Sequence, residues 1–180
     1  RMGVNFTKQI VDCLYTGIST DTGCFRYTNT TADTFRIAAS LVELGCNSAY
    51  INKVMFETKS KEKIMLEREV YDTITYCANE KCAIVWVTLD MLKSLNIGED
   101  EIEGLASIPR QIEGVLIGIT MKEKEGGFFK ISVRTNGDID AAKFCSRFGG
   151  GGHKAAAGCS VNGSLEDVRS QLIKAAEETL

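Results

Sequence analysis

An unbroken β-prone run at residues 82–88 constrains the fold more than any other segment of the sequence. It is apolar at every position but the last, so we expect a strand that is buried within a sheet. A second strand is expected at 128–134, where apolar and polar side chains alternate. Segments with helical periodicity surround both strands. The sequence therefore predicts an α/β (α+β) fold.

Capping residues and periodicity predict the remaining helices and strands. In the first third of the chain, helices are expected at 6–15, from the N-cap Thr31 to about Gly45, and at 48–56. The helix after Thr31 would bury the stripe Phe35, Ala38, Ala39 and Val42. Further helices are expected from Asp90, at 99–106, at 139–148 and after Ser164, where Asp167 completes a capping box. Strands are also expected at 112–121 and 155–161, with a turn at 122–127.

A wholly polar stretch at 58–63 marks a boundary in the chain. Helical patterns dominate before it, and strands appear after it. We therefore expect one domain at 1–57, a connecting helix at 58–80 and a second domain at 81–180. The connecting helix would carry Leu66, Val70, Ile74 and Cys77 along one face.

The composition excludes several protein classes. With 44% hydrophobic and 25% charged residues, the 180-residue chain resembles a soluble globular protein with one core or two small ones. A single proline argues against a Pro-rich disordered segment. No apolar run approaches the roughly 20 residues that a membrane-spanning helix needs. No signal peptide pattern is present.

The charge distribution is more informative than the net charge of −3, which argues against a protein that coats long nucleic acids. Residues 127–158 contain five basic and two acidic side chains: Lys130, Arg134, Lys143, Arg147 and Lys154 against Asp138 and Asp140. This local excess fits a small anionic ligand, and it fits a solvated protein face equally well.

The seven cysteines contain no Cys-x-x-Cys pair, and most lie in apolar stretches. A structural zinc site usually has closely spaced cysteine and histidine ligands, so none is predicted. We expect these cysteines to be small buried residues of a protein in the reducing cytoplasm.

Four consecutive glycines, residues 149–152, precede His153, the single histidine of the chain. Successive backbone N–H groups without side chains can bind a phosphate or a carboxylate, so Gly150, Gly151, Gly152 and His153 are candidate ligand-binding residues. A flexible surface loop with an incidental histidine fits the same residues. The phosphate-binding P-loop pattern is absent, because no Gly-Lys-Ser/Thr ends the run.

Three charged side chains are further candidates. Asp21 precedes Thr22 and Gly23, which is typical of an Asx-turn and also of a carboxylate ligand for magnesium or manganese. Arg134 lies on the polar side of its expected strand, where its planar guanidinium could bind phosphate or simply face solvent. Arg110, after the sole proline, is a weaker candidate of the same kind.

Taken together, these segments resemble a known family. Residues 18–27, followed by Asn29, Thr30 and Thr31, resemble the last metal-site motif of the DHH phosphoesterases. Residues 131–134 and 148–154 resemble the signature of the DHH-associated C-terminal domain, and residues 108–115 match it as well. The nearest branch is the nano-RNase and pAp phosphatase group, which is related to RecJ-type exonucleases.

The resemblance implies a division of tasks. Residues 1–57 would be the helical end of a DHH catalytic domain, and 81–180 a substrate-binding domain with a mixed β-sheet flanked by helices. Asp21 would be one ligand of two manganese ions, or of magnesium. Arg134, Gly150, Gly151, Gly152, His153 and Arg110 would bind the substrate across a cleft. Short RNA or DNA oligonucleotides and adenosine 3′,5′-bisphosphate are the expected substrates, and a homodimer is compatible with the resemblance.

One departure from the family pattern is large. The Asp-His-His motif that names the family is absent, and the single histidine belongs to the glycine-rich segment. One carboxylate cannot hold two cations that each require about six ligands. We therefore expect the chain to be the C-terminal part of a larger enzyme and to be inactive alone. The alternative is a non-catalytic RNA- or nucleotide-binding module of the same fold. Such a module would resemble the domain at the end of alanyl-tRNA synthetases.

Overall fold

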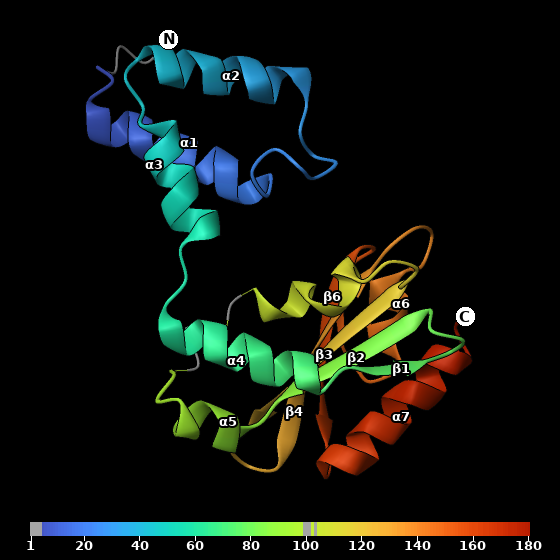
Figure 1. Ribbon diagram of the computed structural model, residues 1–180. Coiled ribbons are helices and arrows are strands. Elements are labelled where there is room, and N and C mark those ends of the chain that lie inside the picture. Colours follow the sequence, from blue (N-terminus) through green and yellow to red (C-terminus); the bar gives the residue numbers. More distant parts are fainter. Residues whose placement is uncertain (1–4, 99–101, 103) are drawn as a thin grey trace. The chain divides into compact units, whose positions relative to one another are not determined.

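The computed structural model describes residues 5–98, 102 and 104–180 (Figure 1). The chain divides into two compact units, Arg1–Lys59 and Ser60–Leu180. Each unit has its own hydrophobic core. Within the described residues, no helix combines the length and the apolar character needed to cross a bilayer.

The first unit packs helices around a small core. Its elements are α1 (Lys8–Asp21), α2 (Ala32–Glu43), α3 (Ser48–Asn52) and a π-helical turn, η1 (Lys53–Glu57). The three α-helices begin at N-caps whose side chains accept backbone hydrogen bonds, namely Thr7, Thr31 and Asn47. The core residues are Val11, Tyr15, Ala38, Leu41, Cys46 and Ile51.

A polar network connects α1 to α3 inside this unit. The buried Ser19 hydroxyl donates a hydrogen bond of 2.7 Å to Oδ1 of Asn52. The amide nitrogen of Asn52 donates in turn to the hydroxyl of Tyr15 at 3.1 Å. These bonds satisfy polar groups that would otherwise be costly to bury, and they fix the two helices against each other.

The expected N-cap of α2 is confirmed, but its expected buried stripe is partly wrong. Of the four expected residues only Ala38 is buried, because Ala39 is exposed and Phe35 and Val42 are 55% and 45% exposed. The buried residue that the pattern missed is Leu41. The ring of Phe35 stacks on Phe25 with a centroid separation of 5.3 Å. Apolar residues occur on more than one face of α2, so the i, i+3, i+4 pattern does not single out the packed face.

The second unit contains a six-stranded mixed sheet. In spatial order its strands are β1 (Thr75–Cys77), β2 (Cys82–Val87), β3 (Ile117–Lys124), β4 (Phe128–Thr135), β6 (Ala156–Asn162) and β5 (Gly151–His153). Strands β2 and β3 are parallel, and the other neighbours pair antiparallel. The predicted mixed sheet flanked by helices is therefore confirmed.

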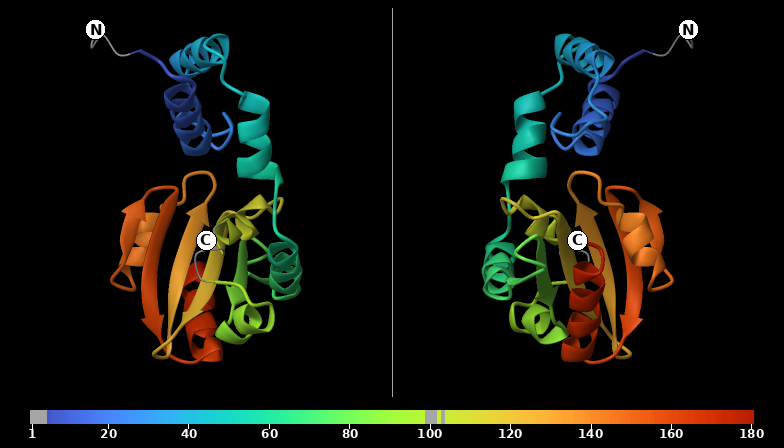
Figure 2. Two further views of the ribbon diagram at one scale, coloured as in Figure 1. Left: turned by 90° about the vertical axis from the view of Figure 1, so that its left-hand side faces the viewer. Right: turned by 90° about the vertical axis from the view of Figure 1, so that its right-hand side faces the viewer.

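Helices cover the two faces of the sheet to different extents. Helices α6 (Ala141–Ser146) and α7 (Leu165–Glu177) share one large core with β2, β3, β4 and β6. On the other face, a smaller core joins β2 to α4 (Lys61–Asp72), α5 (Leu89–Ser94) and the 3₁₀ turn η2 (Leu105–Ser107). A second 3₁₀ turn, η3 (Pro109–Gln111), directly follows Ile108 of this core. In Figure 2 the strands β4 and β6, coloured orange to red, lie toward the edge of the sheet that is away from α4.

Several expected elements of this unit differ in extent. Residues 58–80, expected as one helix, form α4 and then the strand β1, so Cys77 is not on a helix. The strand expected at 112–121 begins only at Ile117, because residues 112–116 form a turn in which the N–H of Val115 donates to the Ile112 carbonyl oxygen at 3.2 Å. Half of the helix expected at 99–106 lies outside the described residues, and its described end belongs to the 3₁₀ turn η2 rather than to an α-helix. The N-cap expected at Ser164 is confirmed by its bond from the N–H of Asp167.

The glycine-rich segment 149–152 leads from a turn at Gly149 into the edge strand β5, so it is not a flexible loop. A side chain at Gly150 would press against the carbonyl oxygen of Gly158 and approach Cα of Cys159 to 2.8 Å. One at Gly152 would lie 2.7 Å from the Ala156 carbonyl oxygen. At Gly151, a Cβ atom would meet nothing within 4 Å. Gly150 and Gly152 therefore allow β5 to approach β6, whereas Gly151 faces open space.

This difference predicts opposite outcomes for two alanine substitutions. Gly150→Ala should lower the free energy of unfolding by about 1–3 kcal/mol, because the methyl group overpacks against backbone. Gly151→Ala should change it by less than about 0.5 kcal/mol, as at an unobstructed surface position. Urea unfolding followed by circular dichroism measures both, and equal losses would contradict the packing of β5 described here.

Candidate functional site

The alternation along β4 gives the sheet one buried and one polar side. Phe129, Ile131 and Val133 are buried in the core beneath α6 and α7. Lys130 and Arg134 lie on the opposite side, as successive strand residues must, and are exposed and half-buried. Strand β6 alternates in the same way. We call the polar side of β4, β6 and β5 the open face; its residues are Lys130, Ser132, Arg134, Gly151, His153, Ala156, Gly158 and Ser160.

Strand register brings the predicted substrate-binding residues of β4 and β5 together. Arg134 faces Ala156 of β6, and Ala156 faces His153 of β5. Directly opposed residues of antiparallel strands have their side chains on the same face. Arg134 and His153, although 19 positions apart in the sequence, therefore flank a single small residue in one row across the open face.

Arg110 reaches the same row through its backbone. On the other side of β4, Arg134 faces Gly118 of β3. A Cβ atom on Gly118 would lie 2.7 Å from the backbone nitrogen of Arg110, so the glycine allows η3 to rest directly on the sheet. The amide of Asn136 donates to the carbonyl oxygens of Arg110 and Val115, at 3.2 and 2.9 Å, and anchors this turn.

The open face continues along the strands beyond this row. Gly151 faces Gly158, and Gly158 faces Ser132, so the second row exposes backbone that no large side chain covers. In the third row, Lys130 faces Ser160. Successive rows are about 6.8 Å apart, because two residues of a strand advance by that distance. Basic groups therefore lie at both ends of a path with a glycine-lined centre.

This arrangement suits a ligand that carries phosphate. The Nη1 atom of Arg134 donates to the carbonyl oxygen of Val133 at 3.1 Å, which fixes one edge of the guanidinium group. A guanidinium group held in this way can donate two parallel bonds to an oxyanion. The exposed ring of His153 adds a hydrogen-bond donor, and the bare backbone at Gly151 allows a ligand to approach closely.

The remaining basic residues of segment 127–158 have other roles. Arg147 forms an ion pair with Glu178 and also donates to the carbonyl oxygen of Ala175 at 3.0 Å. Lys154 forms an ion pair with Asp138 at 3.3 Å. The five basic residues of segment 127–158 therefore do not form one cluster. Of these five, only Lys130 and Arg134 lie on the open face.

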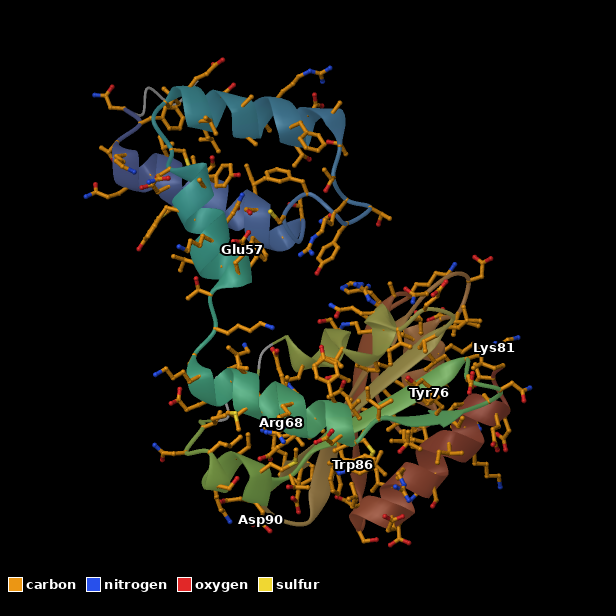
Figure 3. The ribbon with its side chains drawn as sticks, in the orientation of Figure 1. Glu57, Arg68, Tyr76, Lys81, Trp86 and Asp90 are labelled. Atoms are coloured by element: carbon orange, nitrogen blue, oxygen red, sulfur yellow. The ribbon has the colours of Figure 1, made fainter. Side chains whose placement is uncertain are left out.

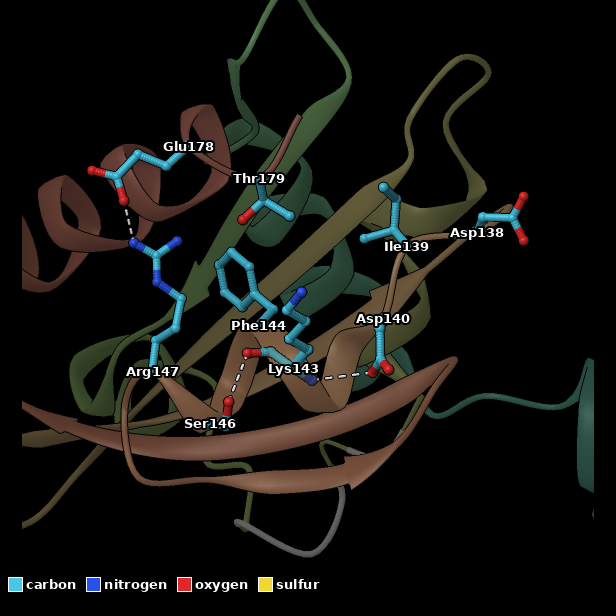
Figure 4. Close-up of a pocket in the computed structure, with 9 residues that line it drawn as sticks. All are labelled: Asp138, Ile139, Asp140, Lys143, Phe144, Ser146, Arg147, Glu178 and Thr179. Carbon is cyan, nitrogen blue, oxygen red and sulfur yellow. Dashed lines mark hydrogen bonds and ion pairs between the residues drawn. The ribbon is translucent and has the colours of Figure 1, made fainter.

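A cavity of about 530 Å³ lies on the helical side of the sheet (Figure 4). Its walls are Asp138, Ile139, Asp140, Lys143, Phe144, Ser146, Arg147, Glu178 and Thr179, none of which was a predicted site residue. Its charged groups serve the fold, since Asp140 caps α6 and Arg147 is paired with Glu178. The cavity is therefore distinct from the open face.

Asp21 belongs to the first unit and lies at the end of α1, not in the tight turn that the sequence suggested. Its carboxylate is exposed, and the amide nitrogen of Asn29 donates to its Oδ2 atom at 3.0 Å. Gly23, Cys24 and Phe25 follow with φ angles of 57°, 58° and 62°, a left-handed path that turns the chain sharply after the helix.

The described residues do not form a metal site by themselves. No group of three or more His, Cys, Asp or Glu side chains within them is close enough to hold a metal ion. Asp21 offers one carboxylate, and the neighbouring Asn29 already uses its amide nitrogen to bind it. A divalent cation requires about six ligands, so this carboxylate could serve only as part of a larger ligand set.

The chain is similar in sequence or fold to several known proteins, including the following three. The bifunctional oligoribonuclease and PAP phosphatase NrnA of Thermus thermophilus is 30% identical to it, over 99% of this chain and 53% of that protein. The A-adding tRNA nucleotidyltransferase of Aquifex aeolicus is 26% identical over 96% of this chain and 20% of that protein. The crystal structure of an exopolyphosphatase-related protein from Bacteroides fragilis superposes with a TM-score of 0.86 at 25% identity, covering 96% of this chain and 52% of that one.

The chain spans about half the length of the NrnA proteins that it matches. Its strongest family assignment concerns the second unit, because residues 79–180 match the DHHA1 domain. That range includes the whole open face and more than half of the chain. Residues 79–180 are therefore a DHHA1 domain, and the chain belongs to the DHHA1 domain family.

Proposed function

We propose that the protein is a metal-dependent phosphoesterase that hydrolyses short oligonucleotides, adenosine 3′,5′-bisphosphate or both. The observation that carries the proposal is the row on the open face, where Arg134 and His153 flank Ala156 beside the turn that carries Arg110. The names of the NrnA relatives support the same substrates.

The open face would bind the phosphate end of the substrate. Arg134 donates two bonds to the phosphate, His153 donates a third, and Gly151 lets the phosphate lie against the strand. These groups select an oxyanion without reading a base. The next phosphate of an oligonucleotide would lie toward Lys130, two rows farther along the face.

Asp21 would contribute one metal ligand as a member of a larger ligand set. Bound manganese or magnesium would activate water and stabilise charge on the phosphoryl group. What this chain adds is a carboxylate whose orientation is restrained by Asn29 and by the end of α1.

A binding module without catalysis is the second candidate. It is favoured by one finding: a similar segment occurs in a tRNA nucleotidyltransferase, where it makes up 20% of the protein. Such a module would bind nucleotides through the same open face, since phosphate recognition there needs no metal. Turnover of a dinucleotide by the intact protein, measured with manganese present, separates the two functions.

Replacing Arg134 tests the role of the open face. Arg134→Ala should raise KM for adenosine 3′,5′-bisphosphate about 10–100-fold, because a hydrogen bond to a charged group contributes about 1.5–3 kcal/mol. Arg134→Lys should recover only part of this loss, since lysine lacks the two-pronged geometry. The matched control is Arg169→Ala, on α7 across the sheet, which should leave KM unchanged. An unaltered KM in both Arg134 variants would rule out this face as the phosphate site.

Replacing Asp21 tests the metal ligand. Asp21→Asn should lower kcat at least about 100-fold in the intact protein with manganese, because a neutral amide is a poorer ligand for a divalent cation. Its free energy of unfolding should change by less than about 0.5 kcal/mol, since the side chain is exposed. Asp33→Asn, an exposed carboxylate of α2, is the control and should keep full activity. Wild-type kcat in Asp21→Asn would refute the assignment.

Replacing Lys130 tests the direction of the substrate along the face. Lys130→Ala should raise KM for a trinucleotide about 3–10-fold and leave KM for adenosine 3′,5′-bisphosphate nearly unchanged, since only the longer substrate extends a further phosphate to the third row. Lys143→Ala, on α6, is the control. Equal effects of Lys130→Ala on both substrates would contradict the proposed path.

A further inference from the structure

Two cysteines face each other across the hairpin of β1 and β2. Cys77 is the last residue of β1, Cys82 is the first of β2, and the two are directly paired in the antiparallel register. Both side chains lie on the side of the sheet that packs beneath α7. Facing residues of antiparallel strands have Cα atoms about 4.5–5.5 Å apart, which is within the roughly 4.4–6.8 Å that a disulfide spans.

The turn between the two cysteines holds the pair in place. Ala78, Asn79 and Glu80 have φ angles of 51°, 54° and 63°, so three consecutive residues without a glycine are left-handed. Such backbone persists only where its surroundings enforce it. Ala78 packs against the core, and the N–H of Lys81 closes the turn on the Ala78 carbonyl oxygen at 3.2 Å. Figure 3 labels Tyr76 and Lys81, the residues that adjoin the two cysteines.

The two thiols differ in exposure and in acidity. Cys77 is half-buried and Cys82 is fully buried. A hydrogen bond from the Cys82 thiol lowers the pKa of Cys77, although burial and the nearby Glu177 oppose that shift. The same hydrogen bond, together with burial, raises the pKa of Cys82. The thiolate is the reactive form, and Cys77 is both the less buried and the more acidic of the two thiols, so it is the better placed of the pair to act as the nucleophile.

We propose that Cys77 and Cys82 form a thiol-oxidation site that reacts with a peroxide and closes to a disulfide. In the first step, the Cys77 thiolate attacks one peroxide oxygen, the O–O bond breaks, and a sulfenic acid forms as hydroxide or alkoxide leaves. In the second step, the Cys82 sulfur attacks the Cys77 sulfur, the S–O bond breaks, and the Cys82 proton leaves with the oxygen as water. Two thiols are oxidised, and one peroxide is reduced.

A second thiol pair provides an internal comparison. Cys145 of α6 and Cys159 of β6 also share a hydrogen bond, which lowers the pKa of Cys159 and raises that of Cys145. However, both of these side chains are buried, so a peroxide reaches neither without local opening. Cys13, which is exposed on α1, reports the reactivity of an ordinary surface thiol.

Peptide mapping tests the proposal on the intact protein. The protein is treated with increasing hydrogen peroxide, its remaining thiols are alkylated, and it is digested with trypsin without reductant. Trypsin cuts after Arg68, Lys81 and Lys93, so the disulfide appears as a covalent link between peptides 69–81 and 82–93. A link between Cys145 and Cys159 would join peptides 144–147 and 155–169 instead.

We expect the 69–81/82–93 link at a peroxide dose at least about tenfold below that which links the second pair, because the attacking thiol is already accessible. It should disappear on reduction. In Cys82→Ala, a sulfenic acid should accumulate at Cys77 and be trapped by dimedone, whereas Cys77→Ser should leave Cys82 reduced. Circular dichroism confirms that each variant is folded.

Three results would overturn the proposal. The first is oxidation of Cys77 to sulfinic acid without the link. The second is oxidation of Cys13 before Cys77. The third is equal linking in urea-unfolded protein, which would show that proximity in the sequence, rather than the folded hairpin, brings the sulfurs together.

Discussion

The burial of alternate residues of β4 and β6 beneath α6 and α7 is the constraint on which the open face depends. Ile131 and Val133 are fully buried, so β4 cannot shift by one residue without moving them into solvent. The same register fixes Arg134 on the opposite side and aligns it with His153 through β6. The hydrophobic core thus determines where the polar groups lie, although none of them takes part in the core.

Three glycines determine how closely the turn η3 and the strand β5 approach their neighbours in the sheet. Gly118 admits η3, which carries Arg110, and Gly150 and Gly152 admit the edge strand β5 against β6. Side chains at these positions would hold η3 and β5 away from the sheet. Gly151 is different, because nothing in the described protein occupies the space beside it. The four-glycine run therefore combines strand packing with an open backbone position.

The sequence predicted the strands and helix starts that have a regular pattern or a capping residue. It did not predict the short strands or the alignment of residues across the sheet, because these depend on three-dimensional contacts. The alternation around Ile131 identified β4, and the capping residues Thr31 and Ser164 identified helix starts. The three-residue strands β1 and β5 have no periodic pattern and are defined by their neighbours. Arg134 and His153 were each proposed from residue type and resemblance, but their alignment in one row became apparent only from the strand register.

The central claim is that phosphate binds to the open face, and chemical-shift mapping tests it most directly. Adenosine 3′,5′-bisphosphate would be titrated into ¹⁵N-labelled intact protein. We expect the largest shifts at the amides of Gly151 and His153 and at Nε of Arg134, with a common dissociation constant. Shifts confined to the cavity beneath the sheet, around Lys143 and Thr179, would contradict it.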